Sequence, residues 1–444
     1  MPCRCRETAR ASVSEVLLRF YQPFLQRYGS TMSPVQRSAL QSILLCRTEA
    51  MGGHRYRCTH CRHEHFAWHS CNHRLCPRCG AVDTAAWVAH KLEERLSVDH
   101  YLVTVTLPAQ LRPLCLIRGA EFYRKFSRSS SRAVKGVLAD PRHLGGQCGF
   151  MGMFQSWRQD LLLHPHIHFI VPGIGLGKDG NITRLKRKGW LVHGEVFAKR
   201  LKSLLLNELR GTGWLDSKEL SRLWAIKWNC DVKCFGNGEN ALKYLGRYVF
   251  KGPISDARIH KIDTKSVWIR VKDRKSRSYH PVEIEGVEFV RRYLLHALPS
   301  GFHRIRYYGF LHGRSREKLT QIRRQLGAPN PDDSSPKEAS TPEPTPPIYH
   351  CPRCGNAMTH IEHRSRAPPW RRRIPRIWNT HSLTHRPLET TRPSKPFFVT
   401  AKWPCPPVPK YRMHPKNNTS KGKMHTRNNR TASEYSQIIT NPNR

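Results

Sequence analysis

Two Cys-x-x-Cys pairs near the N-terminus constrain the fold of this chain more than any other feature. Cys58 and Cys61 form the first pair, and Cys76 and Cys79 form the second after an interval of fourteen residues. Four thiolates at this spacing are typical ligands of a single tetrahedral Zn²⁺. The surrounding block has few aliphatic residues and needs a metal to hold it together. The sequence therefore predicts one structural zinc site made by these four cysteines. Other residues inside the interval could substitute for one of them or hold a second ion: Cys71, His60, His69 and His73.

A third pair, Cys351 and Cys354, has no fourth Cys-x-x-Cys pair to match it. His350, His360 and His363 could complete a metal site with this pair, or the pair could bind no metal. No apolar secretory segment follows the charged N-terminus. We therefore expect the 15 cysteines of the chain to serve metal binding rather than disulfide formation.

The balance of charges indicates a polyanionic partner. The 444 residues include 76 lysines and arginines against 32 acidic residues, which gives a formal net charge of +44. Nucleic acid would offset the resulting self-repulsion. The basic residues are spread along the chain, and no apolar run approaches the ~18 residues of a membrane span. We expect a protein of the cytoplasm, associated with the nucleoid, and no membrane partner.

Hydrophobic periodicity and composition divide the chain into three parts. Residues 1–98 are predicted to form a helical and zinc-binding domain, and residues 99–326 a domain that mixes strands with helices. Residues 327–444 are predicted to be a linker and a disordered basic tail that contains the third cysteine pair. The main strands are expected at 100–108, 149–156, 161–171 and 227–235, and the main helices at 82–98, 119–138, 195–210, 240–251 and 287–297. The strands at 149–156 and 161–171 should pair in antiparallel fashion.

Three histidines occupy alternate positions of the strand predicted at 161–171. His164, His166 and His168 would share one face of that strand. Pro165 cannot donate to a strand ladder, so the regular strand is expected to begin at His166. That leaves His166 and His168 as a pair that could chelate a divalent cation, and the alternative is a set of histidines without a metal. A hydrolase of the His-x-His-x-Asp-His type is not indicated, because Phe169 stands where that motif needs an aspartate.

The helix predicted at 240–251 carries two tyrosines one turn apart. Tyr244 and Tyr248 lie at the border between an apolar face and a row of cations made by Lys243, Arg247 and Lys251. Phenol hydroxyls beside phosphate-binding charges suit attack on a phosphodiester bond. Ordinary packing of an amphipathic helix would produce the same pattern, so the tyrosine pair alone leaves both interpretations open.

Three motifs, taken together and in order, resemble those of rolling-circle transposases of the insertion sequence 91 type: CTHC…SCNHRLCPRCG, HPHIHFIVPG and YLGRYV. The resemblance covers roughly residues 15–325 and includes GFHRIRYYGFLHGR near the end of that range. These transposases belong to the HUH endonuclease superfamily, which is named for its His-hydrophobic-His motif. The resemblance implies an α+β fold with a palm-like antiparallel sheet, the histidine strand at its centre and the tyrosine helix packed over it.

The same resemblance implies roles for individual residues. His166 and His168 match the ligands of a catalytic Mg²⁺ or Mn²⁺, and Tyr244 and Tyr248 match two nucleophiles. The first two cysteine pairs match the zinc ligands of the N-terminal domain. The implied activity is that of a transposase of an insertion sequence, which cleaves and rejoins single-stranded DNA through a 5′-phosphotyrosine during rolling-circle transposition.

Further contacts follow from this chemistry. A hard metal ion favours an oxygen ligand, for which Gln155 is a candidate. His164 is another possible third ligand, or a general acid-base residue. Arg304, Arg306 and Tyr308 are candidate contacts to DNA. The expected substrates are the single-stranded or hairpin ends of the mobile element, together with target DNA.

Two alternatives remain open at the level of the sequence. A plasmid or phage replication initiator would use the same chemistry, although the cysteine block before the histidine motif favours the transposase. A non-catalytic zinc protein that regulates by binding DNA would have no use for paired histidines or paired tyrosines.

Overall fold

The computed structural model describes residues 11–79, 81–240, 242–243, 246, 252–273, 276, 278–327 and 349–367, and for residues 81–86 it describes the backbone only. All of these residues lie in the first of two compact units, Met1–Ile377. Most of the predicted linker and tail at 327–444 therefore falls outside the described residues.

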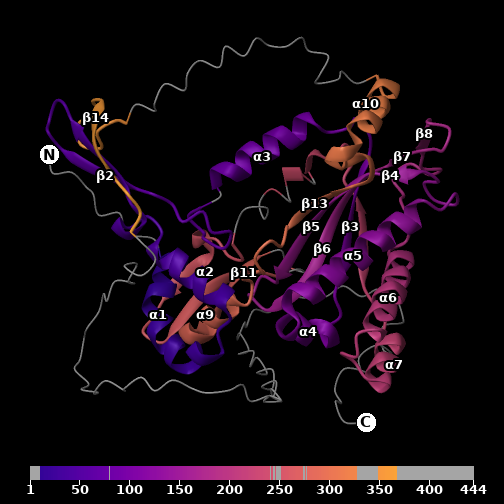
Figure 1. Cartoon of the computed structure of the whole chain (residues 1–444), viewed down its shortest axis with the longest axis horizontal. Coiled ribbons are helices and arrows are strands. Elements are labelled where there is room, and N and C mark those ends of the chain that lie inside the picture. Colours follow the sequence, from indigo (N-terminus) through magenta and orange to yellow (C-terminus); the bar gives the residue numbers. More distant parts are fainter. Residues whose placement is uncertain are drawn as a thin grey trace, which may run out of the picture. The chain divides into compact units, whose positions relative to one another are not determined.

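A five-stranded antiparallel sheet forms the centre of the fold (Figure 1). Its strands are β3 (His100–Thr106), β5 (Phe150–Trp157), β6 (Leu163–Pro172), β9 (Cys230–Cys234) and β13 (Ile305–Tyr308). The strand order is β13-β5-β6-β3-β9, so the histidine strand β6 is central. The antiparallel pairing of β5 with β6 confirms the pairing that the sequence predicts, and the mixture of helices with antiparallel sheets confirms the α+β class.

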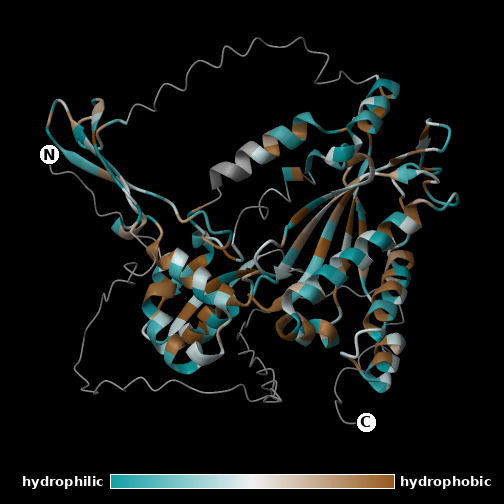
Figure 2. Cartoon of the chain, in the orientation of Figure 1, coloured by the Kyte–Doolittle hydropathy of each residue, from teal (hydrophilic) through white to brown (hydrophobic). Residues whose placement is uncertain are grey.

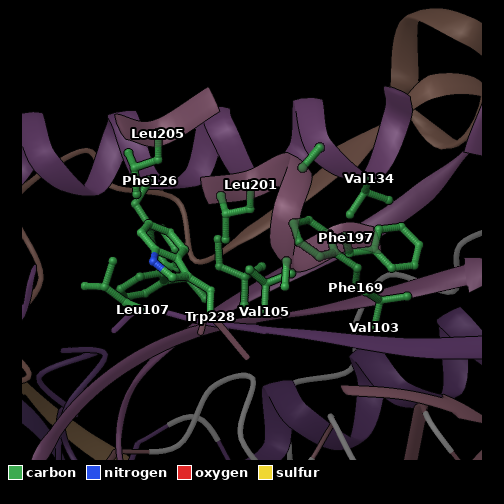
Figure 3. Packing of buried hydrophobic residues seen from close by; sticks show 14 of the residues in the cluster. Val103, Val105, Leu107, Phe126, Val134, Phe169, Phe197, Leu201, Leu205 and Trp228 are labelled. Atoms are coloured by element: carbon green, nitrogen blue, oxygen red, sulfur yellow. The ribbon is translucent and has the colours of Figure 1, made fainter. Parts of the chain in front are cut away.

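One face of this sheet is covered by two long helices, α5 (Gly119–Leu138) and α6 (Gly194–Arg210). The odd-numbered residues of β3 and β6 point to this face, where apolar side chains recur every three or four positions along each helix. Figure 3 shows this packing among Val103, Val105, Leu107, Phe126, Val134, Phe169, Phe197, Leu201, Leu205 and Trp228. Burial of each large apolar side chain stabilises the fold by about 1.5–3 kcal/mol, which holds β6 in a rigid setting.

Shorter helices flank the two long ones. Helix α4 (Arg112–Ile117) leads into α5, and α7 (Ser217–Ala225) follows α6. Asp216 caps α7, and its carboxylate accepts a hydrogen bond from the amide of Glu219. In Figure 2 the helices of this region alternate between hydrophobic and hydrophilic surfaces, as expected for helices that cover one side of a sheet.

The other face of the sheet carries the even-numbered residues of β6, among them His166 and His168. Helix α3 (Ala81–Glu93) covers part of this face with Trp87 and Leu92, and lies on the side of the sheet away from α5 (Figure 1). The two side chains pack with a small cluster made by Leu102, Met151, Met153, Ile170 and Leu242. The histidines therefore belong to a half-covered face rather than to the main core.

A second hydrophobic core joins the N-terminal helices to a later part of the chain. Its elements are α1 (Val13–Tyr28), α2 (Pro34–Leu45), β10 (Ile259–Ile262), β11 (Ser266–Lys272), β12 (Tyr279–Glu285) and α9 (Gly286–Leu294). Ser12 and Ser33 form capping boxes at the starts of α1 and α2, so the N-terminal helical region consists of two separate helices. This packing cuts across the predicted boundary at residue 98, because residues 254–294 pack on the N-terminal helices.

A three-stranded sheet contains segments from both ends of the described chain. Strands β1 (Gly53–Cys58) and β2 (Glu64–Trp68) form a hairpin, and β14 (Met358–Arg364) pairs with β1 from Gly53↔Arg364 to Cys58↔Met358. Residues 349–367 thus differ from the expectation of a linker and disordered tail. Their backbone hydrogen-bonding groups are satisfied by a strand some 300 residues away in the sequence, a pairing that local patterns do not predict.

The remaining elements are small. Strands β4 (Gln147–Cys148), β7 (Ile174–Leu176) and β8 (Ile182–Arg184) form a third three-stranded sheet. Ile174 and Leu176 of this sheet share a hydrophobic cluster with Ile322 of α10 (Arg316–Gln325). Within the part of the chain that the structure describes, no helix is long and apolar enough to cross a membrane.

Candidate functional site

The start of β6 sets the position of the histidines. The strand begins at Leu163, so Pro165 lies inside it rather than before it, in contrast to the prediction. The regular ladder nevertheless begins at His166, because β3 pairs with β6 only from that residue onward and β5 shifts register between Gln155 and Trp157. A proline, which lacks an amide hydrogen, is tolerated at such an irregularity.

His166 and His168 form a close pair on the face of β6 that turns away from α5. Their exposed fractions are 8% and 6%, and the two ring centroids are 4.7 Å apart in an edge-to-face arrangement. Thr106 and Thr104 of β3 lie directly opposite His166 and His168. The predicted pair is therefore brought together on the central strand.

The protein contacts both imidazoles through Nδ1. The Nδ1 of His166 lies 2.6 Å from the carbonyl oxygen of His164, so this nitrogen must carry the proton and donate it. The Nδ1 of His168 lies 3.0 Å from Oγ1 of Thr104. Contacts of this kind orient metal-ligating histidines and make Nε2 the ligating atom.

The electrostatic setting keeps His168 uncharged. Burial lowers the pKa of His168 well below its ordinary value, and repulsion from His166 lowers it further. A neutral imidazole is the form that ligates a metal. The donor chemistry of the pair thus fits a divalent cation held by two Nε2 atoms.

The candidate third ligands differ in their surroundings. Gln155 is buried and lies directly opposite His166 on β5, so its side chain shares the histidine face. His164 accepts a hydrogen bond at Nδ1 from Arg112, at 3.0 Å. Among the described residues, the groups of three or more histidine, cysteine or acidic side chains that could hold a metal do not include the histidine pair. Gln155 is the better-placed candidate.

The predicted tyrosine helix is described only in part. Tyr244, Tyr248, Arg247 and Lys251 lie outside the described residues. Lys243 is exposed and forms an ion pair with Glu239.

Two described residues of the same segment lie beside the histidine face. Leu242 packs with Leu102 and Ile170, which belong to that face of the sheet. A methyl group added to Gly246 would overlap Cγ2 of Val88 on α3.

Arg304 and Arg306, both predicted to contact DNA, are not brought together with the histidine pair. Arg306 and Tyr308 lie opposite Gly152 and Phe150, so they point to the face of the sheet away from His168. Arg304 has an exposed fraction of only 9%, and burial lowers its pKa to about 10. Its guanidinium carbon lies 5.0 Å from the centre of the Trp157 indole.

The first cysteine cluster has a different membership from the predicted one. The sulfur atoms of Cys46, Cys71, Cys76 and Cys79 all lie within 4.8 Å of one another. Cys46 follows the end of α2, and its Sγ is 3.6 Å from that of Cys79. The prediction that Cys58 and Cys61 share one ion with Cys76 and Cys79 is therefore wrong in its grouping.

The hairpin explains why spacing alone misled the prediction. Cys71 follows β2 at the end of the hairpin where Gly53 pairs with Trp68, whereas Cys58 lies at the other end of β1. Five steps along a strand separate the two ends by about 16 Å, at roughly 3.3 Å per residue. Neither Cys46 nor Cys71 belongs to a Cys-x-x-Cys pair; the position of Cys71 between the two pairs marks it as a possible substitute ligand, whereas nothing in its local sequence marks Cys46.

The ionisation of this cluster fits a bound cation. Hydrogen bonds from the thiols of Cys71 and Cys76 lower the pKa of Cys46. The pKa of Cys71 is raised, because its thiol donates to Cys46 and to Cys76 and because burial disfavours a further thiolate. A divalent cation would remove this conflict, and four sulfur donors are a common donor set of structural zinc.

The remaining cysteine pairs and histidines form two further groups. The sulfur atoms of Cys58, Cys61, Cys351 and Cys354 lie within 4.8 Å of one another, so the third pair has a partner after all. His363, which the sequence places with that third pair, instead groups with His54 and His69. His350 contacts the carbonyl oxygen of Gly355 through Nδ1, at 3.1 Å, and His360 contacts His54.

The fold and the cysteine clusters define a zinc-binding α+β protein with a histidine pair on its central strand. A family model described as a putative transposase matches residues 149–318, and one described as a transposase zinc-binding domain matches residues 16–107. The chain belongs to the insertion sequence 91 family of transposases and carries the N-terminal zinc-binding domain of that family. Membership of this family implies an enzyme that cleaves DNA and transfers strands.

Two curated relatives extend over most of the chain. A putative transposase, y4qJ, of Sinorhizobium fredii is 35% identical over 351 residues, which is 74% of this chain and 87% of the relative. The transposase for insertion sequence element IS801 of Pseudomonas savastanoi pv. phaseolicola is 25% identical over 338 residues, or 72% of this chain and 78% of the relative. No solved structure matches the chain.

Proposed function

We propose that this transposase mobilises its element by metal-dependent cleavage and rejoining of single-stranded DNA, through a 5′-phosphotyrosine intermediate and rolling-circle transposition. The observation that carries the proposal is the buried pair of His166 and His168, each contacted at Nδ1 by the protein. Two imidazoles on a rigid central strand, oriented by the protein through Nδ1, are suited to hold a catalytic Mg²⁺ or Mn²⁺.

The reaction would transfer the scissile phosphate from the 3′ oxygen of one nucleotide to a tyrosine of the enzyme. The cation supplies electrostatic stabilisation of the charge that develops on the scissile phosphate. Tyr244 or Tyr248 attacks the phosphorus in line and loses its phenol proton, while the bond from phosphorus to the 3′ oxygen breaks and that oxygen takes up a proton. The 5′-phosphotyrosine ester conserves the energy of the broken bond, so a DNA 3′-hydroxyl can reverse the step without ATP.

The described neighbours of the tyrosines support this assignment. Leu242 packs on the histidine face of the sheet, and Gly246 closely approaches Val88 of α3, which also borders that face. Lys243 and the neighbouring cations Arg247 and Lys251 would bind phosphates beside the tyrosines. A second tyrosine would let one active site hold two cuts at the same time.

Single-stranded or hairpin DNA is the proposed substrate. On the histidine side of the sheet, the ammonium of Lys91 lies 4.9 Å from the centre of the Tyr307 ring, which shares a face with Met151. Cations beside aromatic rings are typical of surfaces that bind phosphates and stack bases. The net charge of +44 suits the same partner. Arg304 and Arg306 would contribute to DNA binding only away from the histidine face.

Two other functions compete with this proposal. A replication initiator would form the same covalent adduct, and the transposase relatives favour transposition. A non-catalytic zinc regulator would bind element ends without forming any adduct.

Incubation with labelled single-stranded DNA from the element ends, in the presence of Mg²⁺ or Mn²⁺, tests the proposal. The wild-type chain should form a protein–DNA adduct that survives denaturation, and the double variants His166→Ala/His168→Ala and Tyr244→Phe/Tyr248→Phe should not. His260→Ala, which changes an exposed histidine on β10, is the matched control. Undiminished adduct in the tyrosine double variant would refute the assignment of the nucleophiles, and no adduct from wild type on any end sequence would favour the regulator.

A further inference from the structure

The second cysteine cluster joins two parts of the chain that are far apart in the sequence. The Sγ atoms of Cys58 and Cys354 lie 3.4 Å apart, and those of Cys61 and Cys351 lie 3.5 Å apart. All four sulfur atoms lie within 4.8 Å of one another. Cys58 and Cys351 are buried in a small cluster of their own with Met358, Cys61 is half-buried and Cys354 is exposed, so the four sulfur atoms lie at the edge of the protein.

The two Cys-x-x-Cys turns have the same backbone geometry. In the first, the amide of Cys58 donates to the carbonyl of His63 at 2.9 Å, and the amide of Arg62 donates to the carbonyl of Cys58 at 3.1 Å. In the second, the corresponding bonds run from Cys351 to Asn356 at 2.7 Å and from Gly355 to Cys351 at 2.8 Å.

The residue after the second cysteine of each turn adopts a left-handed conformation. Arg62 has φ of 58° and Gly355 has φ of 75°. An arginine in this region is strained, whereas a glycine is not. Both turns also direct an N–H group at sulfur, from the amide of Cys61 to Cys58 at 3.5 Å and from the side chain of Asn356 to Cys354 at 3.6 Å. Two equivalent turns that face each other with four sulfur atoms present the donor set of a tetrahedral zinc site.

The strands place the two turns face to face. The first turn lies within the β1–β2 hairpin, and the second turn precedes β14, whose pairing with β1 ends at Cys58↔Met358. Met358 packs beside Cys58 and Cys351 in the same cluster. The separation of the sulfur atoms exceeds the roughly 2.0 Å of a disulfide, and all four cysteines are free thiols.

We propose that Cys58, Cys61, Cys351 and Cys354 hold a second structural Zn²⁺, which fastens residues 349–367 to the β1–β2 hairpin. Cys351 and Cys354 lie outside residues 16–107, which the model of a transposase zinc-binding domain matches. The site therefore closes the chain between Cys61 and Cys351 into a loop that contains every strand of the five-stranded sheet. Because such a site does not exist in the unfolded chain, the free energy of zinc binding stabilises the folded, closed arrangement.

Zinc content of the full-length protein, measured by atomic emission under reducing conditions, is the first test. Wild type should contain two zinc ions per chain, and Cys351→Ser/Cys354→Ser should contain one. Cys234→Ser, which changes an exposed cysteine outside both clusters, should retain two. Cys354→His offers a milder change, because histidine also ligates zinc, and should retain two. One ion in wild type, or two in Cys351→Ser/Cys354→Ser, would overturn the proposal.

The second test asks whether metal fastens the two parts together. A site for a specific protease is inserted between residues 335 and 336, and the chain is cleaved there without denaturation. The two fragments should co-elute in size-exclusion chromatography with reductant present and should separate when a zinc chelator is added. Fragments that separate without chelator, or that stay together after complete removal of zinc, would contradict the proposal. The mass of the intact protein would also contradict it if it were lower by two hydrogens for each cysteine pair, because that loss indicates disulfides in place of a metal site.

Discussion

The contact between Thr104 and His168 provides a sensitive test of the proposed pair of metal-ligating histidines. Oγ1 of Thr104 lies 3.0 Å from Nδ1 of His168, whose side chain is almost fully buried. Thr104→Val removes the hydroxyl and nearly keeps the side-chain volume. An outer partner of a ligating histidine typically contributes about 10- to 100-fold to metal affinity. Loss of one neutral hydrogen bond costs about 1 kcal/mol. We therefore expect Mn²⁺ affinity to fall about tenfold, which corresponds to about 1.4 kcal/mol.

The binding of Mn²⁺ is measured by the electron paramagnetic resonance signal of the free ion during a titration. Thr104→Ser keeps a hydroxyl and should restore most of the affinity. Thr106→Val is the matched control, because Thr106 lies opposite His166, whose Nδ1 is contacted by the carbonyl of His164 instead. Thermal melting of each variant separates a change in metal affinity from a change in folding.

The reasoning would be refuted if Thr104→Val and Thr106→Val lost Mn²⁺ affinity equally and if Thr104→Ser bound Mn²⁺ as weakly as Thr104→Val. Such a result would mean that the threonines act by packing and that the hydroxyl does not orient His168. Unchanged affinity in Thr104→Val would show that Nδ1 of His168 is oriented by another group.

Three further predictions address other parts of the molecule. Burial lowers the pKa of His296 to about 4. The Nδ1 of His296 lies 3.1 Å from the hydroxyl of Ser156, and its Nε2 lies 3.0 Å from the carbonyl oxygen of Leu161. Its neutral form is thus the stabilising one, so stability should be full above the ordinary pKa of 6.5 and fall as the pH drops from there to about 4. His296→Gln should flatten that part of a melting-temperature profile, and an unchanged slope would contradict this assignment. Cys46→Ser should remove one zinc ion per chain and lower the melting temperature, because the first cluster shares a core with α1, α2 and α9; a variant that keeps the zinc content of wild type would exclude Cys46 as a ligand. Gly246→Ala should lower the free energy of unfolding by about 1–3 kcal/mol, measured by denaturant titration, because the added methyl group would overlap Val88. Gly211→Ala, where the added methyl group meets open space, should leave the free energy of unfolding nearly unchanged. Val88→Ala should relieve the cost of Gly246→Ala, and an additive loss in the double variant would contradict the packing.

Short-range patterns accounted for much of the fold. The helix predicted at 119–138 coincides with α5, and the strand at 149–156 is β5 to within one residue at each end. Strong periodicity of apolar residues decides such elements locally, whatever they pack against. Alternation along β6 was enough to place His166 and His168 on one face, because side chains of a strand alternate between its two faces.

Pairing between distant segments was beyond the reach of these patterns. Cys46 and Cys71 stand outside any spacing motif, so their place in the first cluster depends on how the β1–β2 hairpin folds back on α2. Thr104 could have been proposed from the alternation of β3, but only the register of β3 with β6 shows that it faces His168. The faces of Arg306 and Tyr308 likewise depend on the register of β13 with β5.

The sequence by itself determined which residues are suited to the chemistry: a histidine pair on an apolar strand, cysteines in Cys-x-x-Cys turns, and the excess of positive charge that indicates nucleic acid. These properties follow from residue type and from spacings of a few positions, which local geometry converts directly into a shared face or turn. The tertiary structure decided which cysteines come together, because a metal site depends on distances between sulfur atoms and not on intervals along the chain. Cys76 is far closer to Cys58 in the sequence than Cys354 is, yet Cys58 meets Cys354, 296 residues away, beside the β1–β14 pairing.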